Sequence, residues 1–207
     1  MSISAEMVRK LREETGAGMM DCKSALVEAK GDAEAAREVL RKKGLAAAAR
    51  KAGRAASDGM IGHYIHPGAK IAVIVEVNCE TDFVAKTPEF QGLVKDVAMH
   101  IAASAPLYVR ADNVPAEILD KEREIYKAQA AAQGKPANVQ DRIAEGRLKD
   151  YYAQFCLLEQ PFVKDPKLTI GQLVQEKIAL IKENIVVRRF SRFKVGEEAA
   201  PGTAEPE

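Results

Sequence analysis

Apolar residues recur at helical spacing, three or four positions apart, through the first 44 residues of the chain. This pattern predicts three short helices that end at Thr15-Gly16, Gly31 and Gly44, with Asp32 as the N-cap of the third. The apolar positions are Ile3, Met7, Val8, Leu11, Cys22, Ala25, Leu26, Ala29, Ala36, Val39 and Leu40. Because each stripe holds only three or four residues, many of them small, we expect residues 1–44 to form a minimal three-helix bundle that leans on a partner.

The next segment, residues 45–57, is rich in alanine and has no wide apolar stripe. It carries the basic residues Arg50, Lys51 and Arg54, and Gly53 is a weak point for a helix. We therefore expect an exposed helical linker that lets the bundle move relative to the rest of the chain.

From Gly59 the apolar period shortens to two, which indicates β-strands. Alternating residues from Ile61 to Ile65 predict one strand, and Ile71–Val77 predicts a second strand that is mostly buried. Since Pro67-Gly68 can turn the chain between them, the two strands form a hairpin.

The clearest helical pattern in the chain follows this hairpin and begins at Pro88, with Thr87 placed to cap it. Its apolar face comprises Phe90, Leu93, Val94, Val97, Ala98 and Ile101. Two further helices, from Pro115 to about Ala132 and from about Asn138 onward, are joined by Gly134-Lys135-Pro136 and predict a helical hairpin.

A last helix is expected after a capping box at Thr169 and Gln172, and a last strand from Ile185 to Phe193. The tail at 196–207 is composed of glycine, glutamate, alanine, proline and threonine, and we expect it to be disordered. The fold class is therefore α+β: a bundle at 1–44, a linker at 45–57, and a core at 58–195. This core combines a small antiparallel sheet backed by helices with the helical hairpin.

Composition narrows the functional classes. The chain has 31 basic and 30 acidic residues and a formal charge of +1, so no global field draws it to nucleic acid or to an anionic membrane. No apolar run approaches the roughly 20 residues of a membrane helix. The three cysteines, Cys22, Cys79 and Cys156, share no metal-type spacing and suit a reducing compartment, so we expect a cytoplasmic protein.

Candidate catalytic and ligand motifs are weak. Gly16-Ala17-Gly18 lacks the lysine and the preceding strand of a phosphate-binding loop. His63 and His66 lie three apart in a strand and point to opposite faces, and His100 flanks a core stripe. We therefore predict no metal site, no cofactor and no enzymatic activity, although a spatial cysteine–histidine pair is a weak alternative.

Two stretches remain as candidate binding elements. Arg188, Arg189, Arg192 and Lys194 alternate with Phe190 and Phe193, which can serve single-stranded nucleic acid, but the balanced charge favours an ordinary strand. The other stretch is the short connection after the second strand, where Phe83 follows the charged Asp82. On chemistry alone, Phe83 is either a core plug at the strand–helix corner or an interface anchor.

Two longer stretches resemble the signature sequences of the elongation factor Ts family. They run from Gly16 to Lys23, followed by Ala25-Leu26, and from Asn78 to Ala85, with Ser24 and Glu80 as departures from residues common in that family. The resemblance extends from the N-terminus to about Val195, and the length resembles the short form of the family, which has one core module and pairs with itself. It implies a UBA-like bundle and a guanine-nucleotide exchange factor for elongation factor Tu.

The resemblance also implies roles for individual residues. Asp82 and Phe83 would intrude near the partner's magnesium site and loosen GDP, while Thr81 and Val84 shape the turn. Further contacts with the same partner are implied for Arg12, Met19, Met20, Lys23 and Lys51. It implies elongation factor Tu and a second copy of this chain as partners, with no direct nucleic-acid or membrane partner. A nucleic-acid-binding module and, more weakly, a cysteine-dependent enzyme stay as competing hypotheses.

Overall fold

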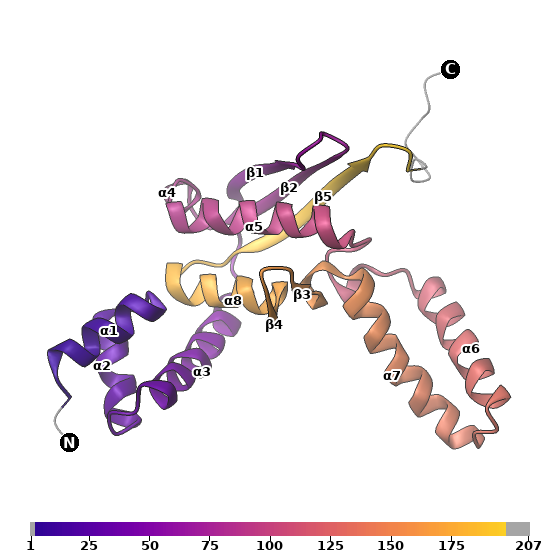
Figure 1. Ribbon diagram of the computed structural model, residues 1–207, viewed down its shortest axis with the longest axis horizontal. Coiled ribbons are helices and arrows are strands. Elements are labelled where there is room, and N and C mark those ends of the chain that lie inside the picture. The colour runs from indigo at the N-terminus through magenta and orange to yellow at the C-terminus, as the bar shows by residue number, and fades with distance from the viewer. Residues whose placement is uncertain (1–2, 198–207) are drawn as a thin grey trace. The chain divides into compact units, whose positions relative to one another are not determined.

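The computed structural model describes residues 3–197 and has a mixed helix and sheet architecture (Figure 1), which confirms the α+β prediction. The chain divides into two compact units. The first comprises residues up to Met60, Val77–Leu93 and Gln172–Val186, and the second comprises Ile61–Glu76, Val94–Gly171 and the chain from Val187. The boundaries predicted from the sequence stay predictions. Most of the tail predicted to be disordered, residues 198–207, lies outside the described residues.

The N-terminal bundle contains the three predicted helices, α1 (Ala5–Thr15), α2 (Met19–Glu28) and α3 (Ala33–Lys51). Asp32 caps α3 as expected, since its carboxylate accepts a hydrogen bond from the Ala35 amide at 2.8 Å. The buried core consists of the expected small residues, Val8, Leu11, Cys22, Ala25, Leu26 and Ala36.

The third helix does not end at Gly44, so that part of the prediction was wrong. Helix α3 continues to Lys51, because the segment after Gly44 consists of strong helix formers such as alanine, leucine and arginine. Gly44 has a packing role instead: a Cβ atom there would lie 3.0 Å from the Cβ of Ala179. The helical character expected for 45–57 is therefore found at Leu45–Lys51, as the last turns of α3.

The sheet is small and antiparallel, with the strand order β1-β2-β5. Strands β1 (Asp58–Ile65) and β2 (Ile71–Cys79) form the predicted hairpin, and β5 (Val186–Lys194) is the predicted last strand. Gly62 allows close packing of the hairpin against a helix, because a Cβ atom there would lie 2.2 Å from Cγ1 of Val94. Sheet and helix thus share one core.

Two helices lie between β2 and the helical hairpin. The short connection expected after the second strand contains a single helical turn, α4 (Asp82–Ala85), and α5 (Pro88–Ser104) is the predicted helix. Thr87 caps α5, since its hydroxyl accepts a hydrogen bond from the Phe90 amide at 3.3 Å. The last helix, α8 (Ile170–Ile181), leads into β5.

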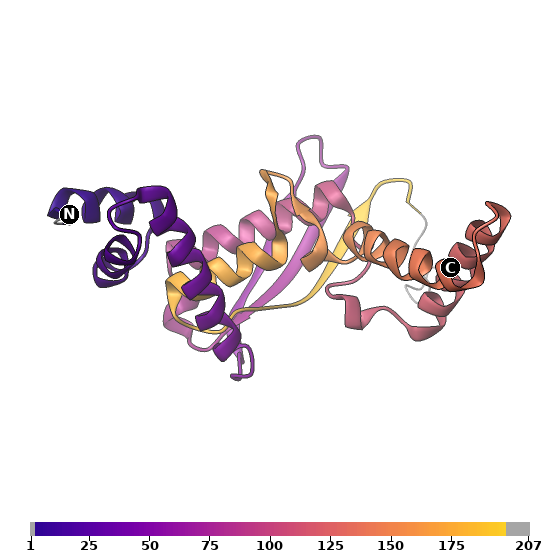
Figure 2. The same ribbon diagram turned by 90° about the horizontal axis from the view of Figure 1, so that it is seen from below.

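The helical hairpin of α6 (Ala116–Ala132) and α7 (Ala137–Phe155) is confirmed, and its two helices lie side by side in both views (Figures 1 and 2). Ion pairs cross between them, Arg123 to Glu145 at 2.9 Å and Lys127 to Asp141 at 2.6 Å. Four short elements that the sequence did not predict flank it: η1 (Ala111–Asn113), η2 (Leu157–Glu159), β3 (Pro161–Phe162) and β4 (Asp165–Thr169).

His100 is fully buried in the second unit and has partners on both ring nitrogens. The Val163 amide donates to Nδ1 at 3.3 Å, so Nε2 carries the proton and donates to Oε1 of Gln160 at 2.9 Å. Burial lowers the pKa of His100, and the neutral ring is the form that these bonds require. The histidine is therefore a core residue with both ring nitrogens hydrogen-bonded.

Candidate functional site

Phe83 lies on the surface, which excludes the core-plug interpretation. Its side chain is 79% exposed, the highest value among the large hydrophobic residues described as exposed. The residues on either side of it hold the backbone: Cys79, at the end of β2, and Ala85, at the end of α4, are both buried. The chain therefore presents an aromatic ring to solvent from a segment that is anchored at both ends.

The residue before Phe83 and a residue after it form an exposed ion pair. Asp82 forms an ion pair with Lys86, one helical turn further on, at 2.7 Å. The hydrogen bond from Lys86 lowers the pKa of Asp82, and the reverse interaction raises the pKa of Lys86. Because both side chains are exposed, this pair is open to exchange of partners with another molecule.

The carboxylate of Glu183, from a distant part of the sequence, accepts hydrogen bonds from the turn. Oε2 of Glu183 accepts hydrogen bonds from the backbone amides of Glu80 at 3.1 Å and Thr81 at 3.0 Å. Its Oε1 accepts a third bond from the Thr81 hydroxyl at 2.7 Å. Thr81 in turn caps α4, since its Oγ1 accepts from the Val84 amide at 3.5 Å.

In a second set of contacts, the carboxylate of Glu80 is the acceptor. Oε1 of Glu80 accepts a hydrogen bond from the Asn184 amide at 2.7 Å, and its Oε2 lies 3.5 Å from the guanidinium of Arg54. The Asn184 side chain donates to the Arg54 carbonyl at 2.7 Å. In the connection between α8 and β5, Glu183 thus accepts hydrogen bonds from the turn, and Asn184 donates one to Glu80.

The bundle exposes the methionines and cations singled out from the sequence. Met20 is 73% exposed and Met19 47% exposed, both in the first turn of α2, and Lys23 is exposed one turn further along. Arg12 is exposed near the end of α1. Lys51 differs from these, because its ammonium group donates to the carbonyl of Lys182 and burial lowers its pKa.

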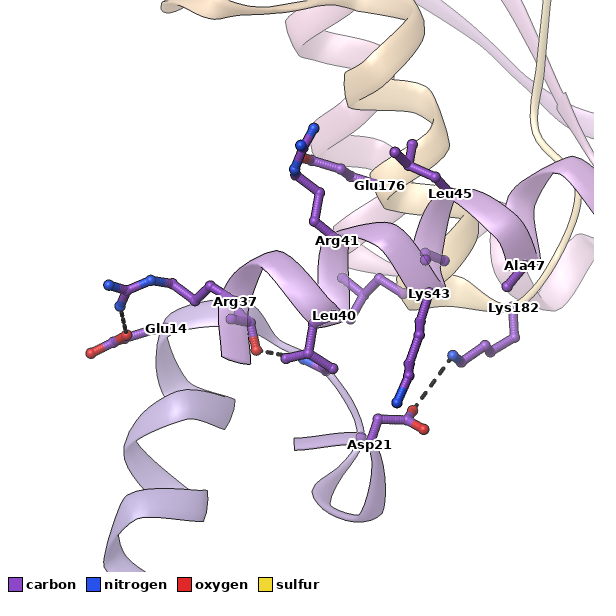
Figure 3. A pocket seen from close by; sticks show the side chains of 16 residues that line it. Glu14, Asp21, Arg37, Leu40, Arg41, Lys43, Leu45, Ala47, Glu176 and Lys182 are labelled. Carbon is purple, nitrogen blue, oxygen red and sulfur yellow. Dashed lines mark hydrogen bonds and ion pairs between the residues drawn. The ribbon is translucent and has the colours of Figure 1, made fainter. Parts of the chain in front are cut away.

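A cavity of about 480 Å³ lies beside the bundle, lined by residues of α1, α2, α3 and α8 (Figure 3). Its cations are paired with carboxylates: Arg37 with Glu14 at 2.7 Å and Lys182 with Asp21 at 3.7 Å. The remaining two cations form similar pairs, Arg41 with Glu38 and Lys43 with Glu28. Each of the four cations in the lining thus has a carboxylate partner, and apolar side chains such as Leu40 and Leu180 contribute to the rest of the wall.

Strand β5 supplies little free positive charge for nucleic acid. Arg189 lies 2.7 Å from Glu76 and Arg188 3.7 Å from the same carboxylate, while Arg192 is paired with Glu197 at 2.7 Å. Of the four basic residues in this strand, only Lys194 is exposed without such a pair to a described residue, so the exposed Phe193 is not accompanied by a row of free cations that would hold phosphates. These contacts weigh against the nucleic-acid alternative.

The cysteines are poorly suited to nucleophilic chemistry. All three are buried and free, and burial raises the pKa of Cys79 and raises the pKa of Cys156 to about 11. Among residues 3–197, no group of three histidine, cysteine or acidic side chains is arranged to hold a metal ion. In the same range, no helix is long and apolar enough to cross a membrane.

These features define a mixed helix and sheet protein whose most prominent surface site is an aromatic residue on a supported turn, which is typical of a binding factor. The family model described as "Elongation factor TS" matches residues 5–197. Proteins named "Elongation factor Ts" are similar over nearly the whole chain. The one from Carboxydothermus hydrogenoformans is 59% identical over 198 residues, 96% of this chain and 91% of the relative. The one from Caldanaerobacter subterraneus is 59% identical over 195 residues, which are 94% of this chain and 98% of the relative. The chain belongs to the elongation factor Ts family.

Sequence reasoning identified the turn but missed the residues that hold it. Glu183, Asn184 and Arg54 were not among the candidate residues, although each contacts the turn or its neighbour Glu80. The polar run that ends α8 was the available signal, but nothing in the sequence links it to a turn about one hundred positions earlier.

Proposed function

We propose that this protein binds elongation factor Tu in its GDP-bound form and promotes the release of GDP and its exchange for GTP. The observation that carries the proposal is Phe83, an aromatic side chain that is 79% exposed on a turn held by Glu183. Membership of the elongation factor Ts family supports the choice of partner.

In the proposed mechanism, Asp82 and Phe83 enter the partner near its magnesium site. A magnesium ion bridges the phosphates of a bound nucleotide and neutralises their charge, so a disturbed magnesium site holds GDP less tightly. Linkage requires the reverse effect as well: GDP weakens binding of this protein by the same factor. Exchange of this kind breaks and forms no covalent bond, and we propose that the protein is not an enzyme.

The bundle has the complementary role of gripping the partner. Met19 and Met20 are flexible, polarisable side chains that adapt to a neighbouring surface, and Arg12 and Lys23 add positive charge beside them. Lys51 is included by resemblance. To contact a partner, its ammonium group must either break its hydrogen bond to the Lys182 carbonyl or keep that bond and donate a second one.

We also propose that the protein forms a homodimer in the cytoplasm through β5. This strand lies at one edge of the sheet, and Phe193 near its end is 59% exposed. An edge strand that exposes an aromatic residue is prone to aggregation unless another chain covers it. In a symmetric dimer, the β5 edge of each protomer would be covered by the other protomer.

The test is the release of labelled GDP from elongation factor Tu, measured with and without this protein. The proposal predicts that release accelerates with increasing concentration of this protein and then saturates. Phe83→Ala should remove most of the acceleration. Release at the spontaneous rate, with wild-type protein in large excess, would overturn the proposal.

A further inference from the structure

The three hydrogen bonds to Glu183 satisfy donors that the local fold leaves without partners. The amides of Glu80 and Thr81 lie between the end of β2 and the start of α4, outside the internal hydrogen bonds of either element. A single carboxylate accepts from both amides and from the Thr81 hydroxyl. Bonds with an ionised acceptor are stronger than neutral ones, so this contact is an effective restraint on the turn.

Helix formation by itself contributes little to the order of the turn. Helix α4 has only four residues, and an isolated helix of that length is unstable in water. Phe83 and Asp82 are exposed and add no packing of their own against the turn. Side chains that contact this backbone add to its order. The Cys79 thiol and the Thr87 hydroxyl each donate one hydrogen bond to it, and Glu183 accepts three, the most of any described side chain.

The position of Glu183 is itself fixed. Lys182 just before it has a φ of +70°, a left-handed conformation that reverses the chain at the end of α8. Asn184 just after it is 2% exposed and bonds both the Glu80 carboxylate and the Arg54 carbonyl. Glu183 is thus held between two restrained residues and presents its carboxylate to the turn from a defined backbone.

We propose that Glu183 is a positioning residue for exchange: it holds Thr81–Val84 in the conformation that presents Phe83 to the partner. The proposal rests on the proposed function. A turn ordered before binding does not lose that conformational freedom during binding, so the contact of Phe83 is stronger. Glu183 acts through the turn and touches neither nucleotide nor reacting atoms.

The first measurement concerns the free protein and does not depend on the partner. We compare amide hydrogen exchange at Glu80 and Thr81 in wild type, Glu183→Ala, Glu183→Gln and the matched control Glu145→Ala. Glu145 also accepts an ionic hydrogen bond, from Arg123 at 2.9 Å, but lies in the helical hairpin. Glu183→Ala should speed exchange of the two amides about tenfold or more, and Glu145→Ala should leave them unchanged.

Glutamine at position 183 should restore part of the protection. Its side-chain oxygen can accept from the two amides while its NH₂ group donates to the Thr81 hydroxyl, so the shape is kept and the charge is lost. Unchanged protection of both amides in Glu183→Ala would overturn the proposal. Thermal unfolding of each variant shows whether the fold is intact, and Glu183→Gln provides the readout if the alanine variant does not fold.

The second measurement is a double-mutant cycle on GDP release. Glu183→Ala alone should slow saturated release by about ten- to a hundredfold, with Glu183→Gln between it and wild type. In a Phe83→Ala background the same change should slow release less than about twofold, because the ring that Glu183 positions is absent. An undiminished effect in that background would mean that Glu183 acts independently of Phe83 and would overturn the proposal.

The two measurements separate this proposal from the proposed function. If Phe83→Ala exchanged GDP normally, the function assigned to the turn would fail, whatever the amides showed. If Phe83→Ala abolished exchange while Glu183→Ala left the amides and the release rate unchanged, the function would stand and the positioning role of Glu183 would fail.

Discussion

Replacement of Phe83 by alanine separates a surface anchor from a structural residue. Truncation of a phenylalanine in a core costs about 3 to 5 kcal/mol of folding stability. Phe83 is 79% exposed, so about a fifth of its side chain is covered and the expected cost is below about 1 kcal/mol. For a chain of this size, that corresponds to a fall in Tm of no more than about 4 °C.

The effect on exchange should be much larger. Truncation of an aromatic anchor at an interface commonly costs about 2 to 4 kcal/mol. If the contact forms mainly as nucleotide leaves, saturated GDP release should slow by roughly thirty- to several-hundredfold, at 1.4 kcal/mol per factor of ten.

The assay needs both quantities from the same preparations: Tm from thermal unfolding, and GDP release from elongation factor Tu at saturating exchange factor. Leu107→Ala is the matched control, because Leu107 is also an exposed apolar residue, at 62%, and lies outside the proposed site. It should change neither quantity appreciably. A large fall in Tm for Phe83→Ala, with near-normal release by the folded fraction, would refute the reasoning.

Three further predictions concern the rest of the chain. The double variant Met19→Ala/Met20→Ala should raise the half-saturating concentration for exchange and leave the maximal rate nearly unchanged, because contacts made equally before and during release contribute only to binding. Normal binding with a lost maximal rate would mean that the bundle, and not the turn, promotes release. The folded-state pKa of His100 lies below its unfolded value, so the unfolded chain binds more protons and stability should fall as pH drops below about 6.5. A His100→Gln variant should lose that part of the pH dependence when its Tm is compared with that of wild type between pH 7.5 and 5.5. An identical pH dependence of Tm in the two proteins would contradict the assignment. Light scattering at micromolar concentration should show a dimer, and a monomer would remove the proposal for β5.

Periodic elements could be predicted from the sequence because burial of one face fixes their pattern. The stripe in α5 and the alternation in β2 both face a core, and the structure places them as expected. Helix α3 was mispredicted at its end because Gly44 is common to two situations: a helix stop, and a close approach between helices such as that with Ala179. The sequence alone does not distinguish them.

Short elements and long-range polar contacts were not predictable. Strand β3 has two residues and α4 has four, too few for a period to be visible. The carboxylate of Glu183 meets the turn because α8 ends in a left-handed residue and the chain then enters β5 beside β2. That meeting depends on the completed sheet, and no local propensity at position 183 encodes it.

The connection between α8 and β5 contacts both of the surfaces proposed to bind the partner, but with different strength. Toward the bundle, the side chain of Lys182 lies 3.7 Å from Asp21, an exposed pair of the kind that contributes little to stability. Toward the turn, Glu183 accepts three hydrogen bonds at 3.1 Å or less. A turn that must present an aromatic ring in one conformation is thus held by the stronger contacts. Toward the bundle, the Lys182 carbonyl also accepts a hydrogen bond from the Lys51 ammonium, so the exposed pair with Asp21 is not the only contact there. We therefore expect substitution of Asp21 to affect exchange less than substitution of Glu183.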